Sequence, residues 1–149
     1  MRKEGNNRNK GKDRIMSKKV YYKLVNANLT SWVAYGILTT KYKVGKWVFA
    51  KKRLLDLGYG LTVFKSFKDL QTYYSNRAFT ASTDKIYECE IGNIIKKPKE
   101  RLFITGADSM KDFREKLIHG SRTIWPIGTV MTDSVKLTKE VSGINLINR

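Results

Sequence analysis

The chain has 149 residues, 41% hydrophobic and 29% charged, which suits one globular domain that buries its own core. Thirty Lys and Arg against thirteen Asp and Glu give a net charge of +17, which favours polyanionic partners. One cysteine and one histidine exclude an internal disulfide and a zinc site built from cysteines, and no apolar run reaches the ~18 residues of a membrane span. We expect a cytoplasmic protein without cofactor, metal, membrane contact or disulfide-linked partner.

The first residues form a basic segment with almost nothing to bury. Residues 1–17 are mostly Asn, Gly, Lys and Arg, which predicts a disordered arm that serves either as a solubilising tail or as a contact with nucleic acid. Residues 1–19 carry eight basic and two acidic side chains, which leaves a net charge of +11 for the rest of the chain. The basic character therefore belongs to the fold as well as to the arm.

Three segments follow before the centre of the chain. Residues 18–25 are β-branched and aromatic and predict the first strand. Asn26 or Asn28 is placed to cap a short helix over residues 29–35, which Gly36 would end. Residues 37–50 are extended again, with a turn or bulge expected at Gly45, and form either a hairpin or one kinked strand.

The segment 41–53 is the most suggestive surface, because it has six basic residues and no acid. Its basic residues alternate with Tyr42, Trp47 and Phe49, and lysines beside exposed aromatic rings suit a single-stranded nucleic acid. Strand alternation offers another interpretation, in which the aromatic rings point inward and the lysines outward. The candidate nucleic-acid-binding residues are Lys41, Tyr42, Lys43, Lys46, Trp47, Lys51, Lys52 and Arg53.

Residues 58–92 hold the clearest local signals. A glycine turn precedes a strand over residues 61–65, and Ser66 with Asp69 forms a capping pair that opens an amphipathic helix over 66–77. Residues 85–91 predict a strand that places one set of side chains on each face. The first set is Tyr87, Cys89 and Ile91, and the second is Ile86, Glu88 and Glu90.

The remaining chain repeats this alternation of elements. We expect a short strand over residues 102–105, a second capped helix over 109–118, one or two strands over 129–141 and a frayed end over 143–149. The fold class is therefore α+β, with a single domain over residues 18–142 built from a mainly antiparallel sheet and two principal helices.

The sequence assigns no reaction, because it has no phosphate loop, dinucleotide fingerprint, zinc-protease helix or nucleophile elbow. Cys89 falls on a strand face as a small core residue, and His119 falls at a helix C-terminus, where the dipole favours a cation. Only Glu88 and Glu90 are catalytic candidates, because burying two like charges together raises one pKa. The alternative is that both simply lie opposite lysines.

The nearest polar partners expected for such an active site are Tyr22, Lys23 and Ser82. The motif Glu88-Cys89-Glu90 with residues 81–83 is similar to the Glu-x-Glu and Ser-Thr-Ser strands of ADP-ribosyltransferases. The two motifs are nearly adjacent here, whereas that family separates them, and Lys23 stands where the family has an Arg or His. These departures argue against NAD chemistry.

A second resemblance covers residues 20–95. The segments 22–24, 42–48, 61–64 and 86–90 follow one another as in small uncharacterised proteins of phages and their hosts. The resemblance implies a compact α+β domain and a phage or prophage origin, in the host cytoplasm or associated with the virion.

The function expected from these observations is non-enzymatic binding of nucleic acid, RNA or DNA, or of another polyanion, largely independently of sequence. One alternative is a virion or host-takeover protein that docks on an acidic protein partner. A second alternative is an ADP-ribosyltransferase-like enzyme that uses Glu88 and Glu90.

Overall fold

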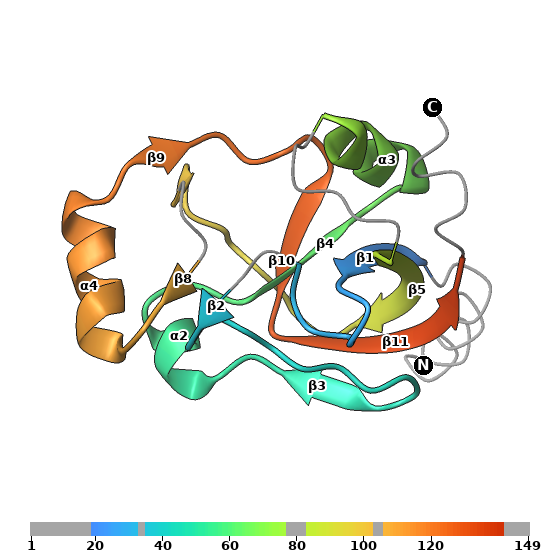
Figure 1. Ribbon diagram of the computed structural model, residues 1–149, viewed down its shortest axis with the longest axis horizontal. Coiled ribbons are helices and arrows are strands. Elements are labelled where there is room, and N and C mark those ends of the chain that lie inside the picture. The colour runs from blue at the N-terminus through green and yellow to red at the C-terminus, as the bar shows by residue number, and fades with distance from the viewer. Residues whose placement is uncertain (1–18, 33–34, 77–82, 103–105, 142–149) are drawn as a thin grey trace, which may run out of the picture.

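Seven strands form one antiparallel sheet, in the order β3-β11-β5-β1-β4-β10-β6 (Figure 1). The computed structural model describes residues 19–32, 35–76, 83–102 and 106–141. The strands are β1 (Tyr21–Val25), β3 (Trp47–Phe49), β4 (Leu61–Phe64), β5 (Lys85–Ile91), β6 (Ile94–Ile95), β10 (Thr129–Thr132) and β11 (Ser134–Glu140). The predicted α+β class, with one compact domain and a mainly antiparallel sheet, is confirmed, whereas the predicted arm over 1–17 and end over 143–149 lie outside the described residues.

One face of the sheet, here called the α3 face, is covered by α3 (Phe67–Ser75). Ser66 caps this helix by accepting a hydrogen bond from the Asp69 amide at 3.0 Å, as the capping pair predicted. Leu70 and Tyr74 are fully buried against the sheet, and the Tyr74 hydroxyl donates to Asp84 Oδ2 at 2.7 Å. The sheet contributes Leu24, Phe64 and Ile86 to this core.

The opposite face, here called the Tyr42 face, is covered by the chain that leads from β1 to β3. Tyr42 and Leu29 pack against it, and the Tyr42 amide donates to the Leu29 carbonyl at 2.8 Å. Because side chains alternate along a strand, the residues of this face lie between those of the α3 face. Its buried strand residues are Tyr21, Val25, Leu61, Val63, Tyr87, Cys89, Val135 and Leu137.

A smaller layer lies beside the sheet, on the left in Figure 1. Its elements are α2 (Lys52–Asp56), α4 (Met110–His119), the parallel pair β2 (Tyr35–Gly36) and β8 (Gly106–Ala107), and the antiparallel pair β7 (Arg101–Leu102) and β9 (Arg122–Thr123). Leu54, Leu102, Ala107 and Phe113 form its core.

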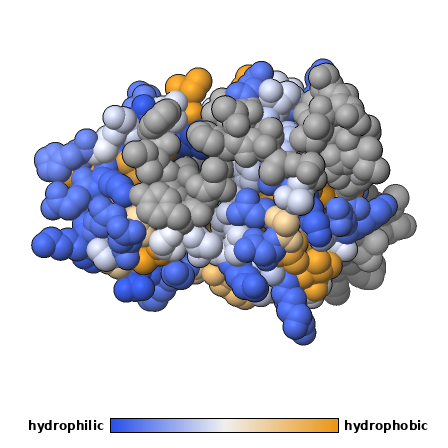
Figure 2. All heavy atoms as spheres, in the orientation of Figure 1, coloured by the Kyte–Doolittle hydropathy of each residue, from blue (hydrophilic) through white to orange (hydrophobic). Residues whose placement is uncertain are grey.

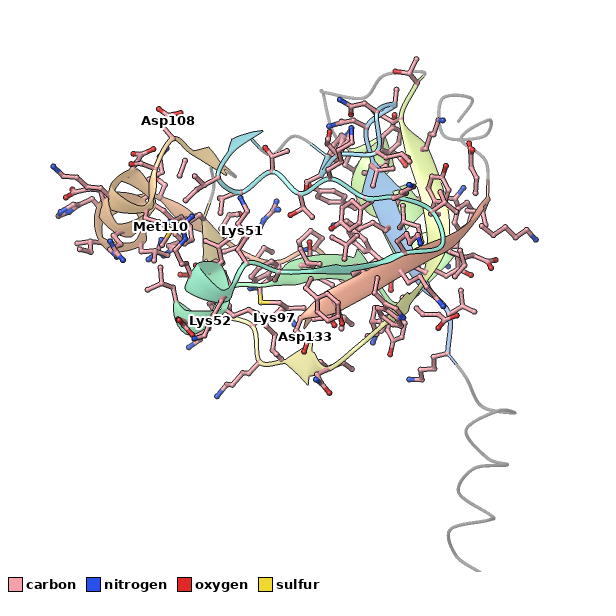
Figure 3. The ribbon with its side chains drawn as sticks, turned by 90° about the horizontal axis from the view of Figure 1, so that it is seen from below. Lys51, Lys52, Lys97, Asp108, Met110 and Asp133 are labelled. Atoms are coloured by element: carbon pink, nitrogen blue, oxygen red, sulfur yellow. The ribbon has the colours of Figure 1, made fainter. Side chains whose placement is uncertain are left out.

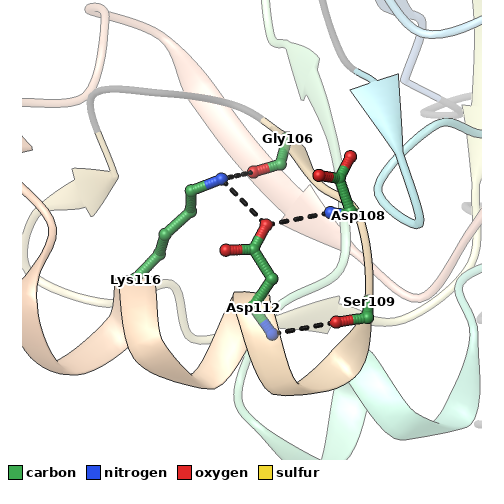
Figure 4. Close-up of polar contacts among 5 residues, drawn as sticks. All are labelled: Gly106, Asp108, Ser109, Asp112 and Lys116. Carbon is green, nitrogen blue, oxygen red and sulfur yellow. Dashed lines mark hydrogen bonds and ion pairs between the residues drawn. The ribbon is translucent and has the colours of Figure 1, made fainter.

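The predicted cap of α4 is present and is part of a larger polar network (Figure 4). Ser109 Oγ accepts from the Asp112 amide at 3.0 Å, and Asp112 Oδ2 accepts from the Asp108 amide at 2.9 Å. Lys116 Nζ donates to Asp112 Oδ2 and to the Gly106 carbonyl, each at 3.1 Å. These contacts lower the pKa of Asp112, chiefly through the Asp108 amide, and tie the start of α4 to β8.

The helix predicted over residues 29–35 is wrong for the part of that segment that the structure describes. Leu29 has a φ of 62°, and Thr30 and Ser31 form isolated β-bridges with Lys41 and Val25. Asn26 does not cap a helix, because its side-chain nitrogen Nδ2 donates to Thr30 Oγ1 at 3.1 Å and to the Ser31 carbonyl at 2.9 Å. The asparagine stabilises a turn instead.

The predicted extended segment 37–50 contains a turn and one short strand in this sheet. Gly45 has a φ of 83° and donates its amide to the Leu137 carbonyl at 2.8 Å, which confirms the turn expected there. The strand predicted over residues 102–105 begins one residue earlier, as β7, and residues 103–105 lie outside the described chain. Among the described residues, no helix is both long enough and apolar enough to cross a membrane.

Candidate nucleic-acid interface

Two aromatic rings project from β3, the strand at one edge of the sheet. Trp47 is 42% exposed and Phe49 is 66% exposed, whereas Val48 between them packs into the core of the Tyr42 face. Trp47 and Phe49 share one side of the strand because they are two residues apart. The interpretation in which alternation turns these rings inward is therefore wrong for β3.

The next strand, β11, places two different residues beside these rings. Lys136 is opposite Trp47, and its Nζ lies 5.5 Å from the Trp47 ring centroid and 3.8 Å from Glu90 Oε1. Ser134 is opposite Phe49 and is a small buried residue. The neighbour of the Phe49 ring on β11 is therefore a small side chain, whereas the neighbour of the Trp47 ring is a lysine.

All six basic side chains of the segment are exposed. Lys51 Nζ donates to the Ile37 carbonyl at 3.1 Å, and Lys52 Nζ lies 3.2 Å from Asp56 Oδ2, both near the start of α2 (Figure 3). An exposed ion pair of this kind contributes little free energy, so Lys52 can exchange Asp56 for a phosphate. Figure 2 shows hydrophilic side chains over much of the molecule, with small apolar patches between them.

Tyr42 does not belong to this surface. It is 2% exposed and packs in the core of the Tyr42 face, where burial raises the pKa of its hydroxyl. The expectation that Tyr42 stacks on a ligand is therefore wrong. Strand alternation did not reveal this, because the turn at Gly45 interrupts the extended chain between Tyr42 and β3.

Glu88 and Glu90 share one face of β5 with Ile86, as predicted; this is the α3 face, where both are half-buried. The structure separates them from one expected partner. Tyr22 is opposite Glu88 on β1, whereas Lys23 points to the Tyr42 face, where its Nζ donates to the Thr62 carbonyl at 2.7 Å. The third expected partner, Ser82, lies outside the described residues. An active site that combines both glutamates with Lys23 is therefore excluded.

Lys23 and Cys89 are two buried titratable residues of the Tyr42 face. Burial lowers the pKa of Lys23 to about 8 and raises the pKa of Cys89 to about 12. The thiol is therefore protonated at neutral pH, which agrees with the prediction that Cys89 is a core residue. His119 ends α4, as predicted, and no group of three or more His, Cys, Asp or Glu side chains within the described chain can hold a metal ion.

No protein-family model, curated protein or solved structure matches this chain. The resemblances to phage proteins and to ADP-ribosyltransferases therefore stay predictions.

Sequence reasoning missed the contribution of Lys136, because its position beside Trp47 depends on the pairing of strands that are almost ninety residues apart.

Proposed function

We propose that the protein binds nucleic acid, largely independently of sequence, through a site here called the β3 surface. This surface consists of Trp47, Phe49, Lys136 and the basic residues Lys41, Lys43, Lys46, Lys51, Lys52 and Arg53. The observation that carries the proposal is the exposure of two aromatic rings on an edge strand within a segment of six exposed cations and no acid.

The kinds of cation favour contacts with phosphate rather than with base edges. Five of the six basic residues in the segment are lysines, whose ammonium groups act as point charges toward phosphate. Arginine predominates where a protein reads guanine through two parallel hydrogen bonds. A lysine surface therefore supplies affinity that depends on charge and varies little with sequence.

The proposal is tested by the salt dependence of binding. The full-length chain is titrated into fluorescently labelled homopolymeric DNA and RNA, and anisotropy gives the affinity at about 50 and about 200 mM salt. If six phosphates of a single strand are engaged, affinity falls by about 300-fold between these salt concentrations. Absence of binding to both polymers at the lower concentration overturns the proposal.

The alternative partner, an acidic protein, is an outcome of a second measurement. A pull-down from lysate is performed with and without nuclease. Partners that remain after nuclease treatment support protein docking, and partners that disappear support nucleic-acid binding. On the sequence resemblance alone, we also propose a phage or prophage origin. A protein of that origin would act in the host cytoplasm or on the virion.

A further inference from the structure

We propose that the β3 surface selects unpaired over paired nucleic acid, because Trp47 and Phe49 each stack on a separate base. This inference rests on the proposed function and names the ligand of the same site. Stacking needs bases whose faces are accessible. Single strands have such bases, and an intact duplex does not.

The spacing of the two rings supports this choice. Residues two apart on a strand are separated by about 6.6–6.8 Å, because each residue advances the strand by about 3.3–3.4 Å. Neighbouring bases of a stacked strand are only about 3.4 Å apart. Two neighbouring bases can therefore meet both rings only after they separate from each other, which a flexible single strand allows.

The surroundings of the rings also favour a base as the occupant. Phe49 projects beside Ser134. Gly92, the residue that follows β5, donates its amide to the Ser134 carbonyl at 3.0 Å. The neighbour of Phe49 on β11 is therefore small, and the Phe49 ring, which is 66% exposed, is accessible to a flat ligand.

The Trp47 ring has a different neighbour, which a ligand can exchange. Lys136 Nζ lies 5.5 Å from the Trp47 ring centroid and 3.8 Å from Glu90 Oε1, and both distances are long for tight contacts. A base that stacks on Trp47 can take the place of the ammonium, which then becomes available to an adjacent phosphate. One nucleotide of the bound strand would then have its base stacked on Trp47 and its phosphate neutralised by Lys136.

Charge complementarity argues for nucleic acid over the other occupants of an exposed aromatic edge. The rings are flanked by Lys46 on one side and by Lys51, Lys52 and Arg53 on the other, and residues 41–53 contain no acid. A second copy of the same chain would bring the same positive segment against it and would be repelled. A polyanion that also carries flat apolar rings matches both features.

The test compares three labelled ligands with the same number of phosphates, about 20 each. They are a thymine single strand, a DNA hairpin that is paired along its stem, and an abasic single strand. The full-length chain should bind the thymine strand at least about tenfold more tightly than the other two. Phe49→Ala and Trp47→Ala should each lower affinity for the thymine strand by about 5- to 100-fold and leave the other affinities unchanged.

Two further kinds of variant separate stacking from folding. Ile127→Ala removes an apolar side chain that is 82% exposed but lies outside the β3 surface, and should change none of the affinities. Phe49→Leu keeps apolar bulk without a flat ring and should lose the preference, whereas Trp47→Phe should keep most of it. Circular dichroism confirms that each variant is folded.

The possible failures are distinguishable. Equal affinity for all three ligands, with no effect of the aromatic variants, overturns stacking and leaves the proposed function standing. If the aromatic variants lose affinity equally for all three ligands, stacking is also overturned, because the rings would then act by maintaining the structure or by placing the charges. Absence of binding to every ligand overturns both proposals. A change of oligomeric state in the variants, with the ligand preference unchanged, assigns the rings to self-association and overturns the inference.

Discussion

Lys23 is buried among aromatic and sulfur-containing side chains of the Tyr42 face, where an ammonium group is poorly solvated. Its Nζ donates to the Thr62 carbonyl at 2.7 Å and lies 5.5 Å from the centre of the Tyr42 ring. Desolvation lowers its pKa from 10.5 to about 8, and the nearby Cys89 opposes this shift only in part. Burial therefore makes the charged form of Lys23 less favourable in the folded state than in the unfolded chain, although it is still the main form at pH 7.

The free energy of unfolding should consequently rise between pH 8 and pH 9. In this range the unfolded chain still holds a proton on Lys23 that the folded chain loses, so a higher pH favours the folded state. The contribution of Lys23 to this rise should amount to about 1 kcal/mol. The burial of Cys89 acts in the opposite direction, because its thiol ionises near pH 9.0 in the unfolded chain and near pH 12 in the folded chain. The net rise is therefore smaller than the contribution of Lys23 and ends above pH 9.

Chemical denaturation of Lys23→Met checks this assignment. The variant should lose the rise between pH 8 and pH 9 and should be more stable than the natural chain at pH 7 by about 2 kcal/mol, because it removes the buried charge. Lys68→Met, which replaces an exposed lysine on α3, should keep the rise. Constant stability of the natural chain between pH 8 and pH 9 would contradict the lowered pKa of Lys23, and a rise that persists in Lys23→Met would assign it to another group.

Residue positions were predictable where one strand runs without interruption. The alternation along residues 85–91 correctly placed Cys89 in the core and both glutamates on the other face. Tyr42 was misplaced because the turn at Gly45 separates it from β3, and residue type alone does not show which aromatic rings point inward. The burial of Lys23 was missed because a lysine in a strand normally indicates the solvated face.

At the scale of the elements, the two capped helices and β5 were predictable because their signals are local. A cap, an apolar stripe and a stop residue occur within about ten residues of one another. The parallel pair β2 and β8 was not predictable, because Gly36 pairs with Ala107 far along the chain. α2 was missed because it has five residues, no side-chain cap and only Leu54 buried.

The local signal of α3 can be measured directly. Ser66→Ala removes the hydroxyl that accepts from the Asp69 amide, and should lower the free energy of unfolding by about 1 kcal/mol. Ser75→Ala is the matched control, because Ser75 is exposed in the last turn and donates to the Gln71 carbonyl within the helix. It should change stability by only a few tenths of a kcal/mol. Equal losses in urea denaturation would contradict the role of the cap.

The non-local pairing of β2 and β8 requires a glycine at position 36. Gly36 has a φ of 65°, and an added Cβ would lie 1.8 Å from the Ala107 carbonyl oxygen. Gly36→Ala should therefore lower the free energy of unfolding by more than about 2 kcal/mol, from strain and from the clash together. Gly45→Ala has a similar φ of 83° with no atom within 4 Å, and should lose only the strain term of about 1 kcal/mol. Equal losses of unfolding free energy in the two variants would show that β8 can move away from position 36 without a free-energy cost.

At the scale of the whole molecule, the net charge of +17 would attract any polyanion to many parts of the surface. The β3 surface is distinguished from this general attraction by local arrangement rather than by charge alone. Exposed cations also occur on α4, in the separate layer beside the sheet (Figure 1). A variant that removes positive charge from the β3 surface must therefore be compared with a control variant that removes the same charge elsewhere on the molecule.

Two double variants make this comparison. Lys43→Gln with Lys46→Gln removes two positive charges next to β3, whereas Lys111→Gln with Arg114→Gln removes two from the exposed side of α4. Both proteins have the same net charge, so a difference between them reports location. For a single strand, each lost phosphate contact reduces the slope of log affinity against log salt by about 0.7. The β3 variant should therefore lose about 1.4 from the slope, and the α4 variant should retain it. Equal reductions would show that the polyanion binds diffusely over the basic surface, and the β3 surface would then have no special role in binding.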